Sequence, residues 1–172
     1  MKVLIVVDMQ NDFIDGSLGT NEAVQIVPKV KEYIDLCRKN GYKIIFTRDT
    51  HGEDYLDTQE GKNLPVEHCI EGSRGWLISD QLDIHEDDII INKPGFGYTS
   101  WGYVLGVDVE KIELCGLCTD ICVVSNALIL KALYREVPIY VNDICCAGVT
   151  PEKHEAAIET MRSCQINIGG GI

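Results

Sequence analysis

Basic residues are scarce in this sequence: 15 lysines and arginines stand against 27 aspartates and glutamates, so the formal net charge is −12. Nucleic-acid binding depends on clustered lysine and arginine, and anionic membrane surfaces attract the same residues. The charge balance therefore argues against both kinds of partner and favours solubility. We expect a protein that binds neither nucleic acid nor a membrane.

Long hydrophobic runs are also missing. No stretch approaches the roughly 20 consecutive apolar residues that a membrane-spanning helix needs. The apolar run near the N-terminus covers only residues 3–7 and ends at Asp8, which is too short for a signal peptide. We therefore expect a cytoplasmic protein. With 172 residues and 45% hydrophobic content, the chain is expected to form one globular domain, residues 1–172.

Cysteine, in contrast, is plentiful, with eight residues. In a reducing compartment these residues are expected to be free thiols, and most of them to be small buried hydrophobic side chains. Cys115 and Cys118 have CxxC spacing, and Cys145 and Cys146 follow a predicted strand, so a zinc or redox site is one alternative. Cys115 lies at the end of a predicted strand, where its side chain is expected to face the core.

Strand-like and helix-like segments alternate along the chain. Strands are predicted at residues 2–7, 43–47, 88–92, 111–115, 137–141 and 165–168, the last as a short edge strand. Helices are predicted at residues 28–40, 120–135 and 151–163. Pro28 and Pro151 suit the first turn of their helices, and Thr150 suits an N-cap. This alternation predicts an α/β fold with a parallel sheet covered on both faces, followed by a frayed tail at residues 169–171.

Polar and reactive side chains follow the predicted strands. Asp8 follows the first strand, Asp49 and His51 the second, Lys93 the third and Cys122 the fourth. The carboxyl ends of parallel strands lie at one edge of the sheet, where open α/β sheets bind their ligands. We therefore expect these side chains to form one site.

Cys122 is the predicted nucleophile of this site. It lies at the turn between a strand and the long helix, where backbone N–H groups and the helix dipole are expected to lower its pKa and to hold an oxyanion. The Lys93 ammonium would stabilise the thiolate further, and Asp8 suits a proton carrier. Taken singly, Cys122 could be a structural thiol and Lys93 a solvated loop residue. Together at one sheet edge, the three residues indicate a nucleophile, an activator and an acid/base.

Three motifs, in order along nearly the whole chain, resemble those of the isochorismatase-like cysteine hydrolases. They are Asp8-Met-Gln-Asn-Asp-Phe13, Lys93 with Tyr98 and Ser100 following, and Gly116-x-x-Thr119-Asp120-x-Cys122-Val123. The resemblance implies a three-layer α/β/α fold with a six-stranded parallel sheet and an Asp8–Lys93–Cys122 triad. It also implies a cis peptide bond before Cys118 and an oxyanion hole made by the backbone N–H groups of Cys118 and Cys122. Such families commonly have a small residue such as alanine at position 118, so the cysteine is a departure.

A second set of side chains follows the second predicted strand. Asp49 and His51 alternate on an extended segment and so face one way. Glu60 and His68 follow in an irregular stretch. Carboxylates and imidazoles together suit a divalent transition metal, with zinc as the default expectation, although a single loop histidine is more often exposed than ligating. The set resembles the metal site of nicotinamidases, where the metal holds the pyridine nitrogen; isochorismatases proper lack it.

The resemblance therefore implies a metal-assisted cysteine amidohydrolase, most similar to nicotinamidases, which convert nicotinamide to nicotinate and ammonia through a cysteine thioester. Phe13, Trp76 and Tyr98 are the candidate walls around a flat ring of this small-molecule amide substrate. One alternative is another small amide or carbamoyl substrate, because residues 52–75 depart in length from nicotinamidases. Another is a non-enzymatic cysteine-rich metal or redox protein. Since family members often associate, we also expect a homo-oligomer.

Overall fold

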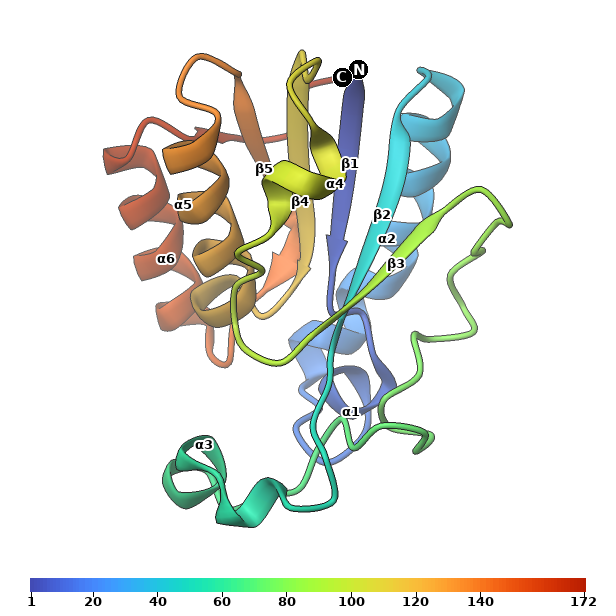
Figure 1. Cartoon of the computed structure of the whole chain (residues 1–172), viewed down its shortest axis with the longest axis vertical. Helices are drawn as coiled ribbons and strands as arrows, with labels where there is room; N and C mark the ends of the chain where they lie inside the picture. The colour runs from blue at the N-terminus through green and yellow to red at the C-terminus, as the bar shows by residue number, and fades with distance from the viewer.

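The computed structural model describes residues 1–172 and contains a six-stranded, all-parallel sheet in the order β3-β2-β1-β4-β5-β6 (Figure 1). The strands are β1 (Lys2–Val7), β2 (Lys43–Asp49), β3 (Ile89–Lys93), β4 (Lys111–Leu117), β5 (Ile139–Ala147) and β6 (Asn167–Ile168). The helices are α1 (Asn11–Ile14), α2 (Asn21–Lys39), α3 (Gln59–Asn63), α4 (Trp101–Leu105), α5 (Val124–Leu133) and α6 (Pro151–Ser163). A 3₁₀ turn (Tyr55–Asp57) precedes α3, and a π-helical turn (Thr119–Val123) precedes α5. The predicted fold class is confirmed.

The sheet lies between two layers of helices. In Figure 1, α2 passes behind the sheet, and α4 and α5 lie in front of it. Residues 3–7 of β1 are completely buried, as expected for a central parallel strand covered on both faces. None of the helices combines the length and the apolar character needed to cross a membrane.

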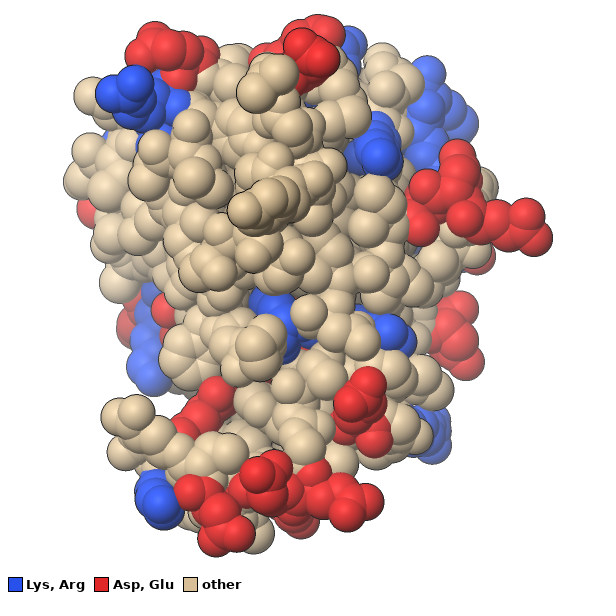
Figure 2. All heavy atoms as spheres, viewed as in Figure 1, with Lys and Arg blue, Asp and Glu red and all other residues tan.

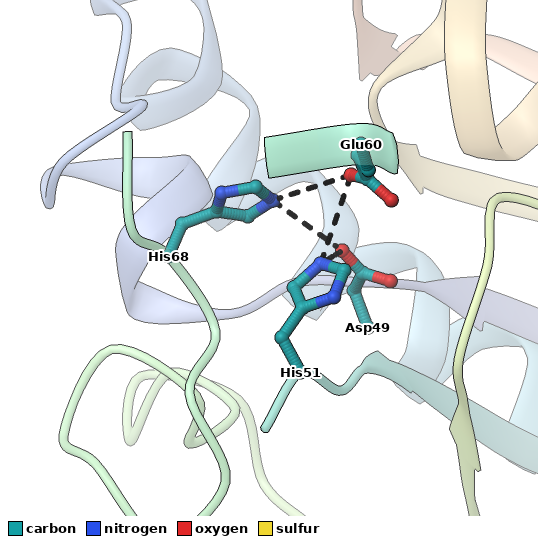
Figure 3. Close-up of side chains that lie close together, drawn as sticks. All are labelled: Asp49, His51, Glu60 and His68. Atoms are coloured by element: carbon teal, nitrogen blue, oxygen red, sulfur yellow. Dashed lines mark hydrogen bonds and ion pairs between the residues drawn. The ribbon is translucent and has the colours of Figure 1, made fainter. Parts of the chain in front are cut away.

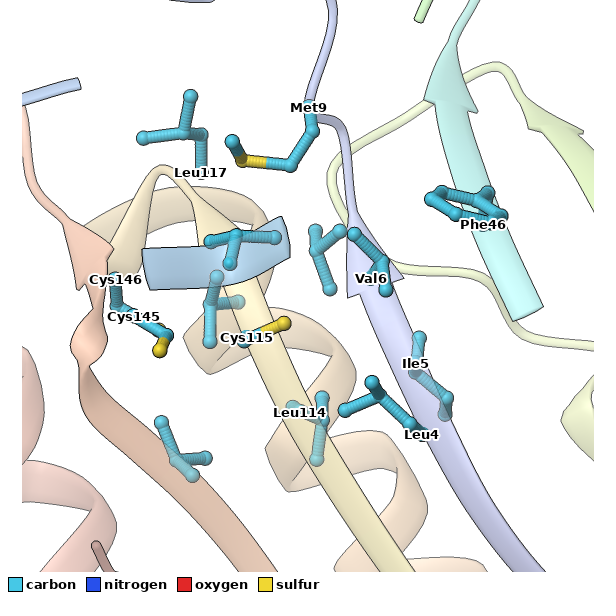
Figure 4. Close-up of a cluster of buried hydrophobic side chains, with 14 of the residues drawn as sticks. Leu4, Ile5, Val6, Met9, Phe46, Leu114, Cys115, Leu117, Cys145 and Cys146 are labelled. Atoms are coloured by element: carbon cyan, nitrogen blue, oxygen red, sulfur yellow. The ribbon is translucent and has the colours of Figure 1, made fainter. Parts of the chain in front are cut away.

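The core carries several of the cysteines. Figure 4 shows Cys115, Cys145 and Cys146 among the aliphatic side chains of β1 and β4. All eight cysteines are free thiols. Burial raises the pKa of Cys145 to about 11 and raises those of Cys115 and Cys146 as well. These three thiols pack as small hydrophobic side chains, as expected for most of the cysteines.

Helix α2 begins earlier than the sequence predicts. Thr20 is its N-cap, and the Thr20 hydroxyl accepts a hydrogen bond of 3.0 Å from the backbone N–H of Ala23. Pro28 therefore lies inside the helix, and its predicted place in the first turn was wrong. A proline there removes one helical hydrogen bond. Buried side chains on both sides of it, including Val27 and Val30, hold the helix against the sheet despite this loss.

The C-terminal glycines are not frayed, so that prediction was also wrong. The backbone N–H of Gly171 donates a 3.1 Å hydrogen bond to the buried carboxylate of Glu113, and Lys111 donates to the Gly171 carbonyl. The hydroxyls of Tyr33 and Tyr42 donate to the same carboxylate. Burial raises the pKa of Glu113. A buried carboxylate needs donors, and the tail supplies one of them.

Gly116 is required by the close pairing of β1 and β4. Its φ is +119°, and a Cβ atom would overlap the carbonyl oxygen of Val7, its partner in the register. Replacing Gly116 with alanine is therefore expected to lower the free energy of unfolding by about 2–4 kcal/mol, measured by urea denaturation. Gly102→Ala is the matched control, because a Cβ at that position in α4 meets no atom within 4 Å. Equal stability of the two variants would contradict this prediction.

Candidate active site

A cleft of ≈ 730 Å³ opens at the carboxyl ends of the central strands. The strand order reverses between β1 and β4, and open α/β sheets bind ligands at such a point. The cleft is lined by Phe13, Leu18, Asp49, His51, Thr58, Gln59, Glu60, Asn63, Leu64, His68, Pro94, Phe96, Cys118, Ile121 and Cys122. The structure thus brings the predicted nucleophile and the predicted metal ligands to one cavity.

Asp8 is completely buried where the chain leaves β1. Its φ is +46°, a left-handed conformation that is uncommon outside glycine and that often marks functional sites. The Thr47 hydroxyl donates a 2.6 Å hydrogen bond to Asp8 Oδ1. Asp8 Oδ2 lies 2.6 Å from Lys93 Nζ but has no well-aligned hydrogen-bond donor. This oxygen is therefore available to accept a proton.

Lys93 lies between Asp8 and Cys122 on one side and Asp49 on the other. Its fully buried ammonium lies 2.6 Å from Asp8 Oδ2 and 3.5 Å from Asp49 Oδ1. It donates to the Gly95 carbonyl at 3.0 Å and lies 3.5 Å from Cys122 Sγ. Burial alone would lower the pKa of Lys93, but the negative charges of Asp8 and Asp49 raise it. Lys93 is therefore a permanent positive charge in the site.

Cys122 lies in the π-helical turn and is only 4% exposed. Burial raises the pKa of its thiol well above the ordinary value; Asp8 raises it further, and Lys93 lowers it. The sequence predicted a lowered pKa at this helix start, whereas the burial of the thiol raises it. Burial also raises the pKa of Asp8, whereas Lys93 lowers it. The raised pKa keeps the Cys122 thiol protonated in the resting site.

Cys118 lines the cleft beside Cys122 and is half-buried. Burial raises the pKa of Cys118 to about 12. Its carbonyl accepts hydrogen bonds of 3.1 Å from the N–H groups of Ile121 and Val123. The cis peptide bond expected before Cys118 is not found: all peptide bonds of the chain are trans. The oxyanion-hole role of the Cys118 and Cys122 N–H groups stays a prediction.

The four predicted metal ligands meet at one end of the cleft (Figure 3). Asp49 ends β2, His51 follows two residues later, Glu60 comes from α3, and His68 comes from the loop after it. Asp49 Oδ2 lies 3.0 Å from His51 Nε2 and 3.6 Å from His68 Nε2. Glu60 Oε1 lies 3.7 Å and 3.8 Å from the same two nitrogens. Around zinc with bonds of about 2.0–2.2 Å, tetrahedral ligand atoms lie roughly 3.3–3.6 Å apart, so the set fits such an ion.

The surroundings of the set also suit a cation. His68 Nδ1 lies 2.8 Å from the Val66 carbonyl, which favours the tautomer with Nε2 free to bind a metal. Burial alone would raise the pKa of Asp49, but hydrogen bonds from His51 and His68 lower it. Burial and the charge of Asp49 raise the pKa of Glu60. Two carboxylates this close favour a positive ion between them.

Of the three predicted ring walls, only Phe13 lines the cleft, where its ring centroid lies 5.5 Å from that of His68. The structure places Trp76 elsewhere. The Arg48 guanidinium carbon lies 3.7 Å from the centroid of the Trp76 ring. The indole Nε1 of Trp76 donates a 2.9 Å hydrogen bond to the Thr50 hydroxyl. Trp76 therefore supports the segment that carries His51 from outside the cleft.

Tyr98 does not line the cleft either. Its ring packs edge-on against Trp101 at a centroid distance of 5.2 Å. The Asn126 side-chain oxygen accepts hydrogen bonds from the Tyr98 N–H at 2.9 Å and from the Trp101 indole at 3.0 Å. The Asn126 amide in turn donates to the Cys122 carbonyl at 2.8 Å. Tyr98 thus contacts Asn126, the residue that supports the turn containing Cys122.

The apolar wall contains residues that the sequence did not indicate. Leu18, Leu64, Phe96 and Ile121 complete the lining together with Phe13. Three of them lie in irregular segments, where hydrophobic periodicity carries no signal. Only Ile121 had a cue, since it directly precedes the predicted nucleophile. The wall makes the cleft suitable for a flat, apolar ring.

The segment that carries α3 is strongly acidic. Residues 52–71 contain six acidic residues and one lysine. Figure 2 shows acidic side chains gathered at the lower end of the molecule, where Figure 1 places α3 and its loop. The cleft lining itself contains no lysine or arginine. The electrostatic field near the cleft therefore favours cations and neutral molecules over anionic substrates.

Comparison with known proteins agrees with this geometry. A family model described as Isochorismatase domain matches residues 2–169, and the chain belongs to this family of hydrolases. The relatives identify it as an amidohydrolase. It is 34% identical to the pyrazinamidase of Pyrococcus horikoshii solved in complex with zinc, with a TM-score of 0.85 over 97% of both chains. The pyrazinamidase/nicotinamidase of Streptococcus mutans UA159 is 25% identical, with a TM-score of 0.87 over 98% of this chain and 99% of that one. The nicotinamidase of Saccharomyces cerevisiae is 29% identical over 98% of this chain and 99% of its own.

Proposed function

We propose that this hydrolase is a nicotinamidase that converts nicotinamide to nicotinate and ammonia, with Cys122 as the nucleophile. The observation that carries the proposal is the position of Lys93. Its ammonium lies 3.5 Å from Cys122 Sγ and 3.5 Å from Asp49 Oδ1, so the nucleophile and the metal-ligand set are one connected site. This arrangement suits an amide whose carbonyl reaches Cys122 while its ring lies toward Asp49.

The first half of the reaction forms a thioester. Asp8 accepts the thiol proton while Cys122 Sγ attacks the amide carbon and a C–S bond forms. The backbone N–H groups of Cys118 and Cys122 stabilise the resulting oxyanion. Asp8 then gives the proton to the amide nitrogen, the C–N bond breaks, and ammonia leaves.

The second half releases the acid. Asp8 takes a proton from a water molecule, and the hydroxide formed attacks the thioester carbon. The C–S bond breaks, Asp8 returns its proton to the Cys122 sulfur, and the product acid loses its proton to solvent and leaves as nicotinate. Lys93 stays charged throughout and orients the Asp8 carboxylate. The raised pKa of Asp8 suits a group that must both accept and return a proton.

Asp49, His51, Glu60 and His68 would hold a divalent metal ion, which we propose is zinc because the set combines imidazole nitrogens and carboxylate oxygens. When bound, such an ion supplies a Lewis acid that can hold a ring nitrogen of the substrate. Phe13, beside His68, would pack on the ring. This combination supports a pyridine carboxamide over other small amides.

Removal of the metal tests the substrate part of the proposal. Treatment with a chelator is expected to lower kcat/KM for nicotinamide, measured by ammonia release, by about tenfold or more, and added zinc should restore it. His51→Ala should show the same loss without restoration by zinc. Labelling of Cys122 by iodoacetamide should continue in both cases.

Two results would change the proposal. Full activity after chelation and in His51→Ala would exclude a role for the metal in this reaction. No ammonia release from nicotinamide by the zinc-loaded protein, combined with thiol labelling confined to Cys122, would indicate a different amide or carbamoyl substrate.

A further inference from the structure

Strand β2 continues beyond the point at which β1 leaves it. Pairing of β1 with β2 ends at Val6 and Phe46, whereas β2 runs on to Asp49, which pairs with Lys93 of β3. The side of Asp49 that faces away from β3 therefore has no strand partner. The side chain of Gln10 takes this place: its Nε2 donates to the Asp49 carbonyl at 2.9 Å, and its Oε1 accepts from the Asp49 N–H at 2.7 Å.

Gln10 makes a third contact from the same amide. Its Nε2 also donates to the Trp76 carbonyl at 2.8 Å, and the side chain is completely buried. A primary amide has the donor and the acceptor that a strand edge would offer, so glutamine can replace the missing strand. Asp49 is thereby fixed between Lys93 on one side and Gln10 on the other.

Asp12, two residues further on, fixes a second ligand segment. Cys69 directly follows His68 and has a φ of +47°, so the chain turns sharply there. The Cys69 N–H donates a 2.8 Å hydrogen bond to Asp12 Oδ2. Phe13, the next residue, packs against the His68 ring. The turn that begins at Asp8 thus contacts two separate segments that carry metal ligands.

We propose that Gln10 and Asp12 are positioning residues of the metal site: they hold Asp49 and His68 in place without contacting the ion. This inference rests on the proposed metal site. It assigns a role to two of the three polar residues of the N-terminal motif that the reaction itself does not use. Loss of such supporting hydrogen bonds typically weakens metal binding by about 10–100-fold.

Zinc affinity of the full-length protein tests this role, measured by competition with a chromogenic chelator at neutral pH. Gln10→Met keeps the length of the side chain without its hydrogen bonds, and Asp12→Ala removes the acceptor for Cys69. Both should raise the Kd for zinc by about 10–100-fold. Asp12→Asn keeps an acceptor oxygen and should stay within about threefold of the wild type.

Asn142→Ala is the matched control, because Asn142 is a buried amide on β5 that does not line the cleft. If Gln10 had a purely structural role, Gln10→Met would behave like Asn142→Ala: the melting temperature of the metal-free protein would fall and the Kd for zinc would be unchanged. The inference requires that only Gln10→Met changes the Kd. Should Gln10→Met fail to fold, Gln10→Glu replaces it, since a carboxylate cannot donate to the two carbonyls and should weaken zinc binding similarly.

The outcomes separate this inference from the proposed function. Zinc binding that is lost in His51→Ala but unchanged in the Gln10 variant would overturn the inference alone. A wild-type protein that binds no zinc, or binds it equally well after His51→Ala, would overturn the proposed metal site and the inference with it.

Discussion

Replacing Cys122 with alanine is expected to lower kcat for nicotinamide hydrolysis by roughly 10⁴-fold or more. The variant has no nucleophile for the thioester step, so only direct attack by water remains. Asp8 and Lys93 stay in place, but neither can form the covalent intermediate. The expected effect is therefore on kcat, measured as ammonia release with zinc-loaded protein.

The same variant should remain folded and keep its metal. The Cys122 thiol lies beside Lys93 and is not one of the four proposed metal ligands. Cys146→Ala is the control, because it removes the same atoms from a thiol that is similarly buried, 5% exposed against 4%, on β5. Cys146→Ala should keep kcat within about threefold of the wild type, because this substitution affects only the packing of the core. Substantial turnover by Cys122→Ala, or inactivity of Cys146→Ala, would contradict the assignment of the nucleophile.

Replacing Lys93 with methionine is expected to lower the free energy of unfolding by about 3–5 kcal/mol and kcat by roughly 10²-fold or more. The ammonium is completely buried against Asp8 and Asp49, and its loss leaves two carboxylates without their shared cation. Urea denaturation measures the first effect and ammonia release the second. A stability equal to that of the wild type would show that the ion pair is not formed in solution.

A double variant separates the charge effect from packing. In Lys93→Met combined with Asp8→Asn, one of the unpaired carboxylates is gone, so part of the lost stability should return although both variants are inactive. If Asp8→Asn instead lowers the free energy of unfolding of Lys93→Met as much as it lowers that of the wild type, the two substitutions are independent. The stability lost in Lys93→Met then arises from packing of the lysine side chain.

The pH dependence of stability gives a further check on the same variant. The pKa of Lys93 is raised above its ordinary value of 10.5, so the folded state binds this proton more tightly than the unfolded state. Its contribution is fully present below pH 10.5 and is lost as the pH rises through the folded pKa. The stability difference between the wild type and Lys93→Met should therefore be constant near neutral pH and become smaller above pH 10.5.

The framework of the site could be predicted because it depends on strand order. Asp8 and Cys122 follow β1 and β4, Lys93 ends β3, and a parallel sheet places all such positions at one edge. The common direction of the Asp49 and His51 side chains could also be predicted, because alternate residues of an extended segment face the same way. Glu60 and His68 were harder to predict, because Glu60 lies in a helix of only 5 residues and His68 in a loop, and neither segment is long enough or regular enough to show a periodicity.

Other features depend on burial and contacts that no local pattern records. The thiol of Cys122 has a raised pKa because of the depth of its position, which the helix start alone does not reveal. Trp76 and Tyr98 have the right chemistry for ring walls, but Arg48 and Trp101 hold them outside the cleft. Pro28 lies within α2 because packing on both sides of it outweighs the local preference of proline for a helix start.

The contact of Lys93 with both Asp8 and Asp49 has a consequence for how this site can change. A single positive charge balances the carboxylate of Asp8, the proposed base, and the carboxylate of Asp49, a proposed metal ligand. Removing Asp49 would leave the charge of Lys93 acting on Asp8 alone, which would lower the pKa of Asp8 and make it a poorer proton acceptor. In the proposed function, substrate preference and proton transfer are therefore linked by the Lys93 ammonium. A redesigned pocket for a substrate without a ring nitrogen would need a new neighbour for Lys93 as well as a new wall for the ligand.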